Sequence, residues 1–170
     1  ASIGLTNLRF VIIFDLDMTL VDTSPLSSLR EKRLWNRVYE KIPTSTIFQG
    51  IINLIQSLKE FYSLGIVTSS PGIYARKLIE YHNLTIPLLI AYHDTKNHKP
   101  HPEPILKGCE QLGLPPSKVI SIGDDFKDIE ASNRAGCTSI FTSWGGTSNS
   151  DLSANYNCSS VAQLKQLLIQ

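Results

Sequence analysis

Two aspartates separated by one residue follow an unbroken apolar run near the start of this 170-residue chain. The run extends from Phe10 to Phe14, and Asp15 and Asp17 come directly after it. Such a run is typical of a strand buried on both faces of a parallel sheet. Its carboxyl end lies at the edge where open α/β sheets bind ligands. Because like charges beside a buried strand cost free energy unless they are compensated, we expect a metal site there.

Further polar residues end later strands or lie in a loop that approaches the same edge. They are Thr68 and Ser69 after residues 66–67, Lys99 in the loop 93–104, and Asp124, Asp125 and Asp128 after residues 119–123. Converging carboxylates suit Mg²⁺, which prefers oxygen ligands, whereas hydroxyls and an ammonium group suit a phosphate. Together these groups provide a nucleophile, a general acid and positive charge, the parts needed for phosphoryl transfer.

The rest of the chain alternates between strand and helix patterns, which predicts an α/β domain. We expect strands at residues 10–14, 66–68, 88–92, 119–122 and 138–142, and helices at 26–40, 51–62, 73–82, 103–112, 128–135 and 161–169. Residues 147–157 are polar and are expected to be loose. The alternation predicts a mostly parallel sheet with helices on both faces, in one domain spanning residues 1–170.

A short insertion, residues 21–50, separates the first strand from the second helix-and-strand unit. It has room for one convincing helix, residues 26–40, which is basic and amphipathic. Its basic residues are Arg30, Lys32, Arg33 and Arg37. Asp22 and Thr23 precede this helix and are of the types that cap a helix amino terminus.

The net charge and the apolar pattern of the chain limit the kinds of partner that we expect. Sixteen Lys and Arg against fifteen Asp and Glu give a net charge of +1, so no nucleic-acid partner is indicated. No apolar run approaches the ~20 residues that span a bilayer, and no secretory signal is evident, so we expect a cytoplasmic protein with no membrane partner. Residue 1 is not Met, which is consistent with a processed or trimmed start and with a missing amino-terminal region.

The remaining metal-ligand residue types lack the spacing of a metal site. Cys109, Cys137 and Cys158 are interpreted as buried thiols of a reducing compartment. The four histidines and Lys96 are interpreted as solvated side chains; the histidines are His82, His93, His98 and His101. Trp144, beside two glycines, is expected either to line the pocket or to cover the sheet edge.

At the polar strand ends the chain resembles the haloacid dehalogenase superfamily, in the phosphatase branch similar to phosphoglycolate phosphatases. Four motifs match in order: residues 15–19 (DLDMT), Thr68 after residues 65–67, Lys99-Pro100, and Gly123-Asp124 with Asp128. The resemblance covers about residues 9–169. It implies a Rossmann-like three-layer sandwich in which residues 21–50 form a very small helical cap insertion.

The resemblance also implies a role for each matching residue. Asp15 would attack phosphorus to form an aspartyl-phosphate, and Asp17 would protonate the leaving oxygen and later activate the hydrolytic water. Mg²⁺ would be bound by the carboxylates of Asp15 and Asp124 and by the backbone carbonyl of Asp17. Asp125 or Asp128 would be an additional metal ligand or would support a metal ligand. Thr68, the Ser69 backbone and Lys99 would bind the phosphate group.

The predicted function is a Mg²⁺-dependent phosphatase for phosphate monoesters. A dehalogenase is disfavoured because a departing halide needs no acid, and a phosphomutase because the chain has little cap. The alternatives kept open are a receiver-like signalling module and a pseudoenzyme that senses phosphate or scaffolds a partner without turnover. Asp17, together with Gly123-Asp124, argues against the receiver-like module.

The small insertion predicts a more open site than that of fully capped relatives. The partner is then a phosphorylated substrate, either one of several small metabolites that the enzyme discriminates weakly or a larger molecule that meets the basic residues of the insertion. A homo-oligomer is the alternative, with Trp35 and its apolar neighbours packing on a second subunit that completes the cover.

Overall fold

A six-stranded sheet in which every strand pair is parallel forms the centre of the molecule. The computed structural model describes residues 10–146 and 148–169. The strand order is β5 (Leu88–Ile90), β4 (Tyr62–Val67), β1 (Phe10–Phe14), β6 (Val119–Gly123), β7 (Thr138–Thr142) and β8 (Tyr156–Cys158). The prediction of a mostly parallel sheet is therefore confirmed.

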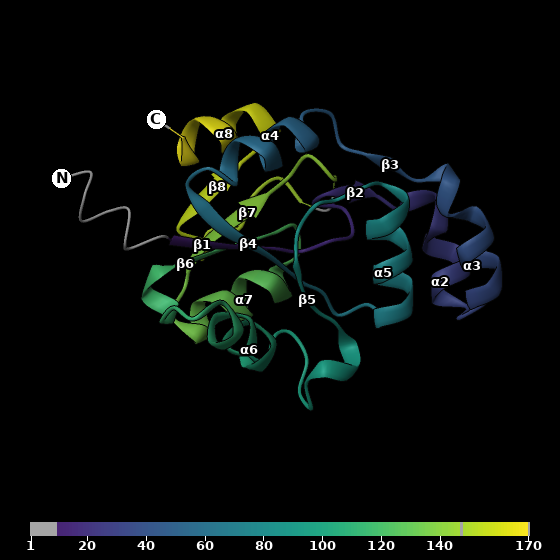
Figure 1. The fold of residues 1–170 in the computed structure, drawn as a ribbon, viewed down its shortest axis with the longest axis horizontal. Helices are drawn as coiled ribbons and strands as arrows, with labels where there is room; N and C mark the ends of the chain where they lie inside the picture. Colours follow the sequence, from purple (N-terminus) through teal and green to yellow (C-terminus); the bar gives the residue numbers. More distant parts are fainter. Residues whose placement is uncertain (1–9, 147, 170) are drawn as a thin grey trace.

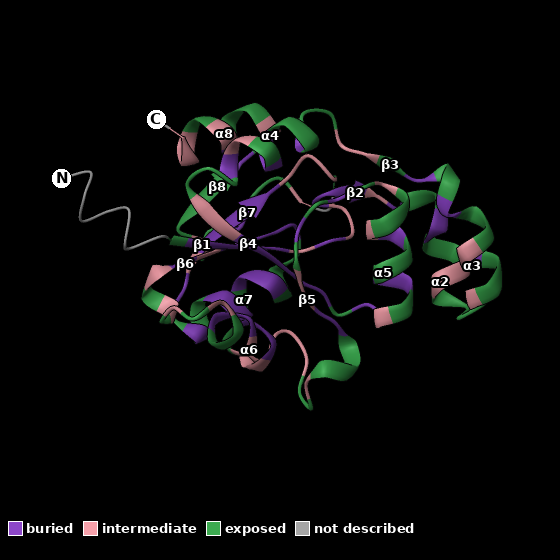
Figure 2. Ribbon diagram, viewed as in Figure 1, coloured by how far each residue is buried: buried purple, intermediate pink, exposed green. Residues whose placement is uncertain are grey.

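Helices cover both faces of this sheet (Figure 1). One face carries α4 (Ile51–Leu58), α5 (Gly72–Tyr81) and α8 (Val161–Leu168), and the other carries α6 (Glu103–Leu112) and α7 (Phe126–Ala135). Side chains of β1 alternate between the two layers: Ile12 and Phe14 pack with the first group of helices, Val11 and Ile13 with the second. Figure 2 shows the resulting buried centre between exposed outer helix faces. The three-layer α/β sandwich is confirmed.

The insertion lies beside α5, at the end of the molecule opposite α8 (Figure 1). It begins with β2 (Val21–Asp22), which pairs antiparallel with β3 (Thr46–Ile47). Between these strands lie a 3₁₀ turn η1 (Ser24–Leu26), α2 (Ser27–Glu31), α3 (Trp35–Lys41) and a second 3₁₀ turn η2 (Ile42–Thr44). The antiparallel pair ties the two ends of the insertion together where it joins the domain.

The prediction of one helix over residues 26–40 is wrong, because the chain breaks between α2 and α3. Arg33 adopts a positive φ of 55°, and the backbone N–H of Leu34 bonds the carbonyl of Leu29 at 3.0 Å. In one straight helix Leu26 and Val38 would be about 18 Å apart along the axis. The break lets both side chains enter the core, where each is 0% exposed. Their burial outweighs the small cost of a left-handed residue.

Other element boundaries also differ from the predictions. The helix expected at 51–62 ends at Leu58, because Tyr62 already pairs with Phe10 at the start of β4. The strand expected at 88–92 ends at Ile90 and is followed by η3 (Tyr92–Asp94), and η4 (Pro116–Lys118) precedes β6. The stretch expected to be loose contains β8 and a turn in which Asp151 accepts a hydrogen bond from the Ser153 amide at 2.9 Å.

Some expectations extend beyond the part of the chain described here. Residues 1–9, 147 and 170 of the expected single domain lie outside the described residues. Within residues 10–146 and 148–169, no helix has the length and apolar character needed to cross a bilayer. Cys109, Cys137 and Cys158 are all free and buried, as expected.

Candidate active site

The ends of three neighbouring strands bring the predicted residues to one edge of the sheet. Asp15 follows β1, and its backbone N–H donates to the Ile122 carbonyl of β6 at 2.8 Å. Thr68 follows β4 and donates in the same way to the Ile90 carbonyl of β5 at 2.9 Å. The sheet ladder therefore continues past the strand ends and holds these two residues in place.

A cavity of about 410 Å³ opens at this edge. All the residues that the sequence predicted for the site line it: Asp15, Asp17, Thr68, Ser69, Lys99, Asp124, Asp125 and Asp128. Met18, Arg30, Ser70 and Lys127 complete the lining. The structure thus brings the predicted residues together, and their catalytic roles stay predictions.

A tight turn from Leu16 to Leu20 follows Asp15 and contains Asp17. The Leu20 amide donates to the Leu16 carbonyl at 3.0 Å, and Met18 has a positive φ of 65°. Gly145 packs against this turn so closely that a Cβ there would lie 2.3 Å from the Met18 carbonyl oxygen. The neighbouring Trp144 donates its indole N–H to the Thr19 carbonyl at 2.9 Å. Trp144 therefore supports the turn and does not line the cavity.

Three carboxylates form an acidic cluster in the cavity. One oxygen from each of Asp15, Asp124 and Asp128 lies within 4.8 Å of the others. Burial raises the pKa of Asp15 well above its ordinary value, and the neighbouring Asp128 raises it further. A divalent cation would relieve both effects, because it compensates the charge that burial and mutual repulsion disfavour. The donor set, all hard oxygen ligands, fits Mg²⁺.

Lys99 lies against this cluster. Its side chain is 4% exposed, and its Nζ donates to Asp128 Oδ1 and the Val67 carbonyl, each at 2.7 Å, and to Asp15 Oδ1 at 3.4 Å. Burial lowers the pKa of Lys99, but Asp128 and Asp15 together outweigh it, so the pKa lies above the usual lysine value. Lys99 is therefore a buried ammonium group that contacts both Asp15 and Asp128.

The loop that carries Lys99 is held by Glu103, the first residue of α6. Its carboxylate accepts hydrogen bonds from the backbone amides of Lys96 at 3.0 Å and Asn97 at 2.9 Å. These amides lower the pKa of Glu103. His101 Nδ1 accepts the Glu103 amide, and the His98 ring stacks on Tyr92. Among the described residues, no histidine or cysteine joins the acidic cluster.

Asp125 and Asp128 together cap the amino terminus of α7. The Asp125 side chain accepts the Lys127 amide at 2.8 Å, and Asp128 Oδ2 accepts the Asp125 amide at 3.2 Å. Asp128 thus both caps the helix and binds Lys99, whereas Asp125 is exposed. A Cβ on Gly123 would lie 2.5 Å from Asp128 Cβ, so the close packing of Asp128 on the strand end requires glycine.

Asp17 is surrounded by hydrogen-bond donors on the side that faces the insertion. Its Oδ1 accepts from the Thr23 hydroxyl at 2.9 Å and the Tyr74 hydroxyl at 2.6 Å, and its Oδ2 accepts from the Ser70 hydroxyl at 2.8 Å. Arg30 Nη1 lies 3.0 Å from Oδ1. The carboxylate of Asp17 is therefore positioned separately from the three clustered carboxylates.

Sequence reasoning did not assign several of these donors to the site. The sequence predicts Arg30 only as one of four basic residues of the insertion that meet a larger substrate. It places the Ser70 hydroxyl at the same strand end as Thr68 and Ser69 without a role, and it does not predict Tyr74 as a site residue. Thr23 was expected to cap a helix and instead donates to Asp17. Asp22 does act as a local cap, because its Oδ1 accepts the Ser24 amide at 3.0 Å.

The chain is similar in sequence to known hydrolases. A family model described as haloacid dehalogenase-like hydrolase matches residues 27–142. Phosphoglycolate phosphatases of Salmonella typhimurium and Escherichia coli are 30% and 29% identical over 119 residues. Each alignment includes 67% of this chain and 47% of the relative, so the chain spans about half the length of the curated relatives it matches.

Solved structures show the same fold. A predicted phosphoglycolate phosphatase from Haemophilus somnus superposes with a TM-score of 0.83 at 20% identity, covering 94% of this chain and 98% of that one. A HAD phosphatase from Thermococcus onnurineus gives a TM-score of 0.81 at 21% identity, with 94% and 98% coverage. With the match to residues 27–142, these findings show that the chain belongs to the haloacid dehalogenase-like hydrolases.

Proposed function

We propose that the protein is a Mg²⁺-dependent phosphatase that hydrolyses phosphate monoesters through an aspartyl-phosphate on Asp15. The observation that carries this proposal is the arrangement around Asp15. Its carboxylate clusters with those of Asp124 and Asp128 and lies 3.4 Å from the Lys99 ammonium. A nucleophile, a set of metal ligands and a cation for the phosphoryl group thus meet at one point, as phosphoryl transfer requires.

The metal-binding residues in this proposal are Asp15 and Asp124 through their carboxylates and Asp17 through its backbone carbonyl. Asp128 belongs to the same cluster but is already bonded to Lys99 and to the Asp125 amide. We therefore assign Asp128 mainly to holding Lys99, and metal binding is its second candidate role. When bound, Mg²⁺ would neutralise the repulsion between the Asp15 carboxylate and the phosphate dianion.

The two half-reactions use the residues of the chain in turn. An Asp15 carboxylate oxygen attacks phosphorus, and the bond between phosphorus and the ester oxygen breaks. Asp17 gives a proton to the departing oxygen, then takes one from the water that hydrolyses the aspartyl-phosphate and frees Asp15. Thr68, the Ser69 backbone and Lys99 hold the other phosphoryl oxygens throughout, and they are most useful where negative charge develops.

The substrate in this proposal is a small phosphate monoester. Phosphoglycolate is the first candidate, because the curated relatives are phosphoglycolate phosphatases. The helices of the insertion have five and seven residues, and Arg30 is the one residue of the insertion that lines the cavity, which supports the prediction of weak discrimination among small esters. The free buried thiols are consistent with the reducing cytoplasm as the compartment.

A panel of phosphorylated metabolites, assayed for phosphate release with Mg²⁺ and with EDTA, tests the proposal. The expected result is release that needs Mg²⁺ and disappears in Asp15→Asn. Phosphate binding without turnover across the whole panel would instead favour the receiver-like or pseudoenzyme alternative.

A further inference from the structure

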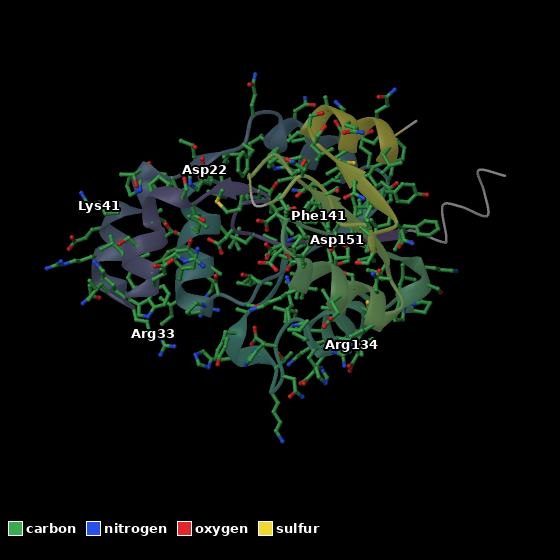
Figure 3. All side chains as sticks on the ribbon, turned by 180° about the vertical axis from the view of Figure 1, so that it is seen from behind. Asp22, Arg33, Lys41, Arg134, Phe141 and Asp151 are labelled. Atoms are coloured by element: carbon green, nitrogen blue, oxygen red, sulfur yellow. The ribbon has the colours of Figure 1, made fainter. Side chains whose placement is uncertain are left out.

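Arg30 is the side chain through which the insertion reaches the catalytic cavity. It lies on α2, is 25% exposed, and lines both the catalytic cavity and a second cavity of about 410 Å³ next to residues 69–71. Other basic residues of the insertion are exposed, and Figure 3 shows Arg33 and Lys41 on its outer side. Of residues 21–50, all of which the structure describes, Arg30 is therefore the one whose side chain lines the catalytic cavity.

The guanidinium group of Arg30 forms a closed ring of contacts with Asp17 and Ser70. Its Nη1 lies 3.0 Å from Asp17 Oδ1, and its Nη2 donates to Ser70 Oγ at 2.8 Å. Ser70 Oγ in turn donates to Asp17 Oδ2 at 2.8 Å. Both oxygens of the Asp17 carboxylate are thus held directly or indirectly by Arg30.

Tyr74 contacts both Arg30 and Asp17. The Arg30 guanidinium carbon lies 4.8 Å from the centre of the Tyr74 ring, a cation–π distance. The Tyr74 hydroxyl donates to Asp17 Oδ1 at 2.6 Å. Arg30 Nε is buried without a hydrogen-bond partner, a cost of about 1–3 kcal/mol in general. The contacts with Asp17, Ser70 and Tyr74 hold the guanidinium group in this position although its Nε–H has no hydrogen-bond partner.

We propose that Arg30 is a positioning residue for Asp17. This inference rests on the proposed function, in which Asp17 must present its carboxyl group to the leaving oxygen of the ester. The Thr23 and Tyr74 hydroxyls hold only Oδ1 of that group, whereas the Arg30–Ser70 pair contacts both oxygens and so fixes the plane of the carboxyl group. Arg30 acts through Asp17, because the phosphoryl group is held elsewhere, by Thr68, Ser69 and Lys99. The insertion thus assists proton transfer through Arg30, with the Thr23 hydroxyl as a second contact to Asp17, without enclosing the substrate.

Two substrates with different leaving groups test this role. An alkoxide must be protonated as it departs, whereas p-nitrophenolate departs without a proton. We expect Arg30→Met to lower kcat/KM for phosphoglycolate about tenfold or more, a part of the ~10²–10⁴-fold contribution of a general acid. The same variant should change kcat/KM for p-nitrophenyl phosphate less than about threefold, because an acid contributes little to that step. The ratio of the two values is independent of the fraction of enzyme that is folded.

Two further variants serve as controls. Arg30→Lys keeps a charge that can reach Asp17 but cannot also bind Ser70, so it should recover part of the loss on phosphoglycolate. Lys41→Met removes an exposed charge from the same insertion and should leave both values unchanged.

Parallel losses on both substrates with a raised KM would overturn the inference, because Arg30 would then contact the substrate itself. Unchanged kcat/KM values of Arg30→Met on both substrates would also overturn the inference. A wild-type protein inactive on both substrates with Mg²⁺ would overturn the proposed function as well, which distinguishes the two failures.

Discussion

Lys99 Nζ lies 2.7 Å from Asp128 Oδ1, closer than the 3.4 Å that separates it from Asp15 Oδ1. The Lys99 and Asp128 side chains are 4% and 8% exposed, so their attraction is weakly screened. The third contact of the ammonium is the Val67 carbonyl at 2.7 Å. The long contact to Asp15 is therefore the one that a phosphoryl oxygen would replace, while Asp128 and Val67 keep Lys99 in place.

The first prediction tests this placement with Lys99→Met. The change leaves Asp15 and Asp128 buried beside each other without their cation, and breaking a buried pair in this way generally costs about 3–5 kcal/mol. Urea unfolding without Mg²⁺ should show a loss of that order in the free energy of unfolding. Lys32 is an exposed lysine of the insertion, and Lys32→Met should change the free energy of unfolding by less than about 0.5 kcal/mol. Equal stability of the two variants would contradict the account of Lys99.

The second prediction concerns Gly123→Ala. A Cβ at this position would lie 2.5 Å from Asp128 Cβ and Oδ2, so Asp128 must move and its contact with Lys99 must change. Overpacking of this kind costs about 1–3 kcal/mol, and phosphate release should fall with it. Gly72→Ala is the matched control, because the new Cβ would meet only the flexible end of Arg76 at 3.1 Å. A Gly123→Ala variant as stable and active as Gly72→Ala would show that Asp128 is free to shift.

The third prediction is a pH dependence of stability without metal. The pKa of Asp15 lies well above its ordinary value of 3.8 in the folded chain. Between pH 3.8 and the raised pKa of the folded state, Asp15 is protonated in the folded protein and ionised in the unfolded chain. The contribution of Asp15 to the free energy of unfolding therefore falls as pH rises. In EDTA, the melting temperature of Asp15→Asn minus that of the wild type should grow from about pH 4 upward. A difference that is constant with pH would contradict the raised pKa.

The fourth prediction concerns Mg²⁺ itself. A cation bound to the cluster of Asp15, Asp124 and Asp128 binds the folded state preferentially, so millimolar Mg²⁺ should raise the melting temperature. Asp124→Ala should abolish this rise and can stabilise the metal-free protein by relieving repulsion. Asp125→Ala, which changes an exposed carboxylate of the same motif, should retain most of the rise. An unchanged wild-type melting curve would count against the metal site.

The elements predicted correctly from the sequence are those that a local pattern of apolar, polar and glycine residues determines. The apolar, partly β-branched run of β1 is typical of a buried parallel strand, and the polar residues after such strands meet at one sheet edge. The elements from residue 103 to residue 142 were predicted nearly as observed, because Gly113 and Gly136 end helices there with positive φ values of 77° and 89°.

The errors occur where tertiary contacts decide the structure. The break at Arg33 depends on burying Leu26 and Val38 together, and no local signal marks it. β8 (Tyr156–Cys158) is a short edge strand with an exposed, polar pattern that lacks the usual apolar alternation. The contact of Arg30 with Ser70 joins residues 40 positions apart, which helical periodicity alone could not place in the site.

The most direct test of the central claim is to trap the intermediate on Asp15. Mixing the protein with a phosphate monoester and Mg²⁺, quenching within one turnover and reducing with borohydride converts an aspartyl-phosphate to homoserine, which peptide mass spectrometry locates. The account predicts homoserine at position 15, none in EDTA, and a residual turnover of Asp15→Asn below about a thousandth of the wild-type rate. Phosphate release with no modified residue at position 15, or substantial turnover by Asp15→Asn, would contradict it.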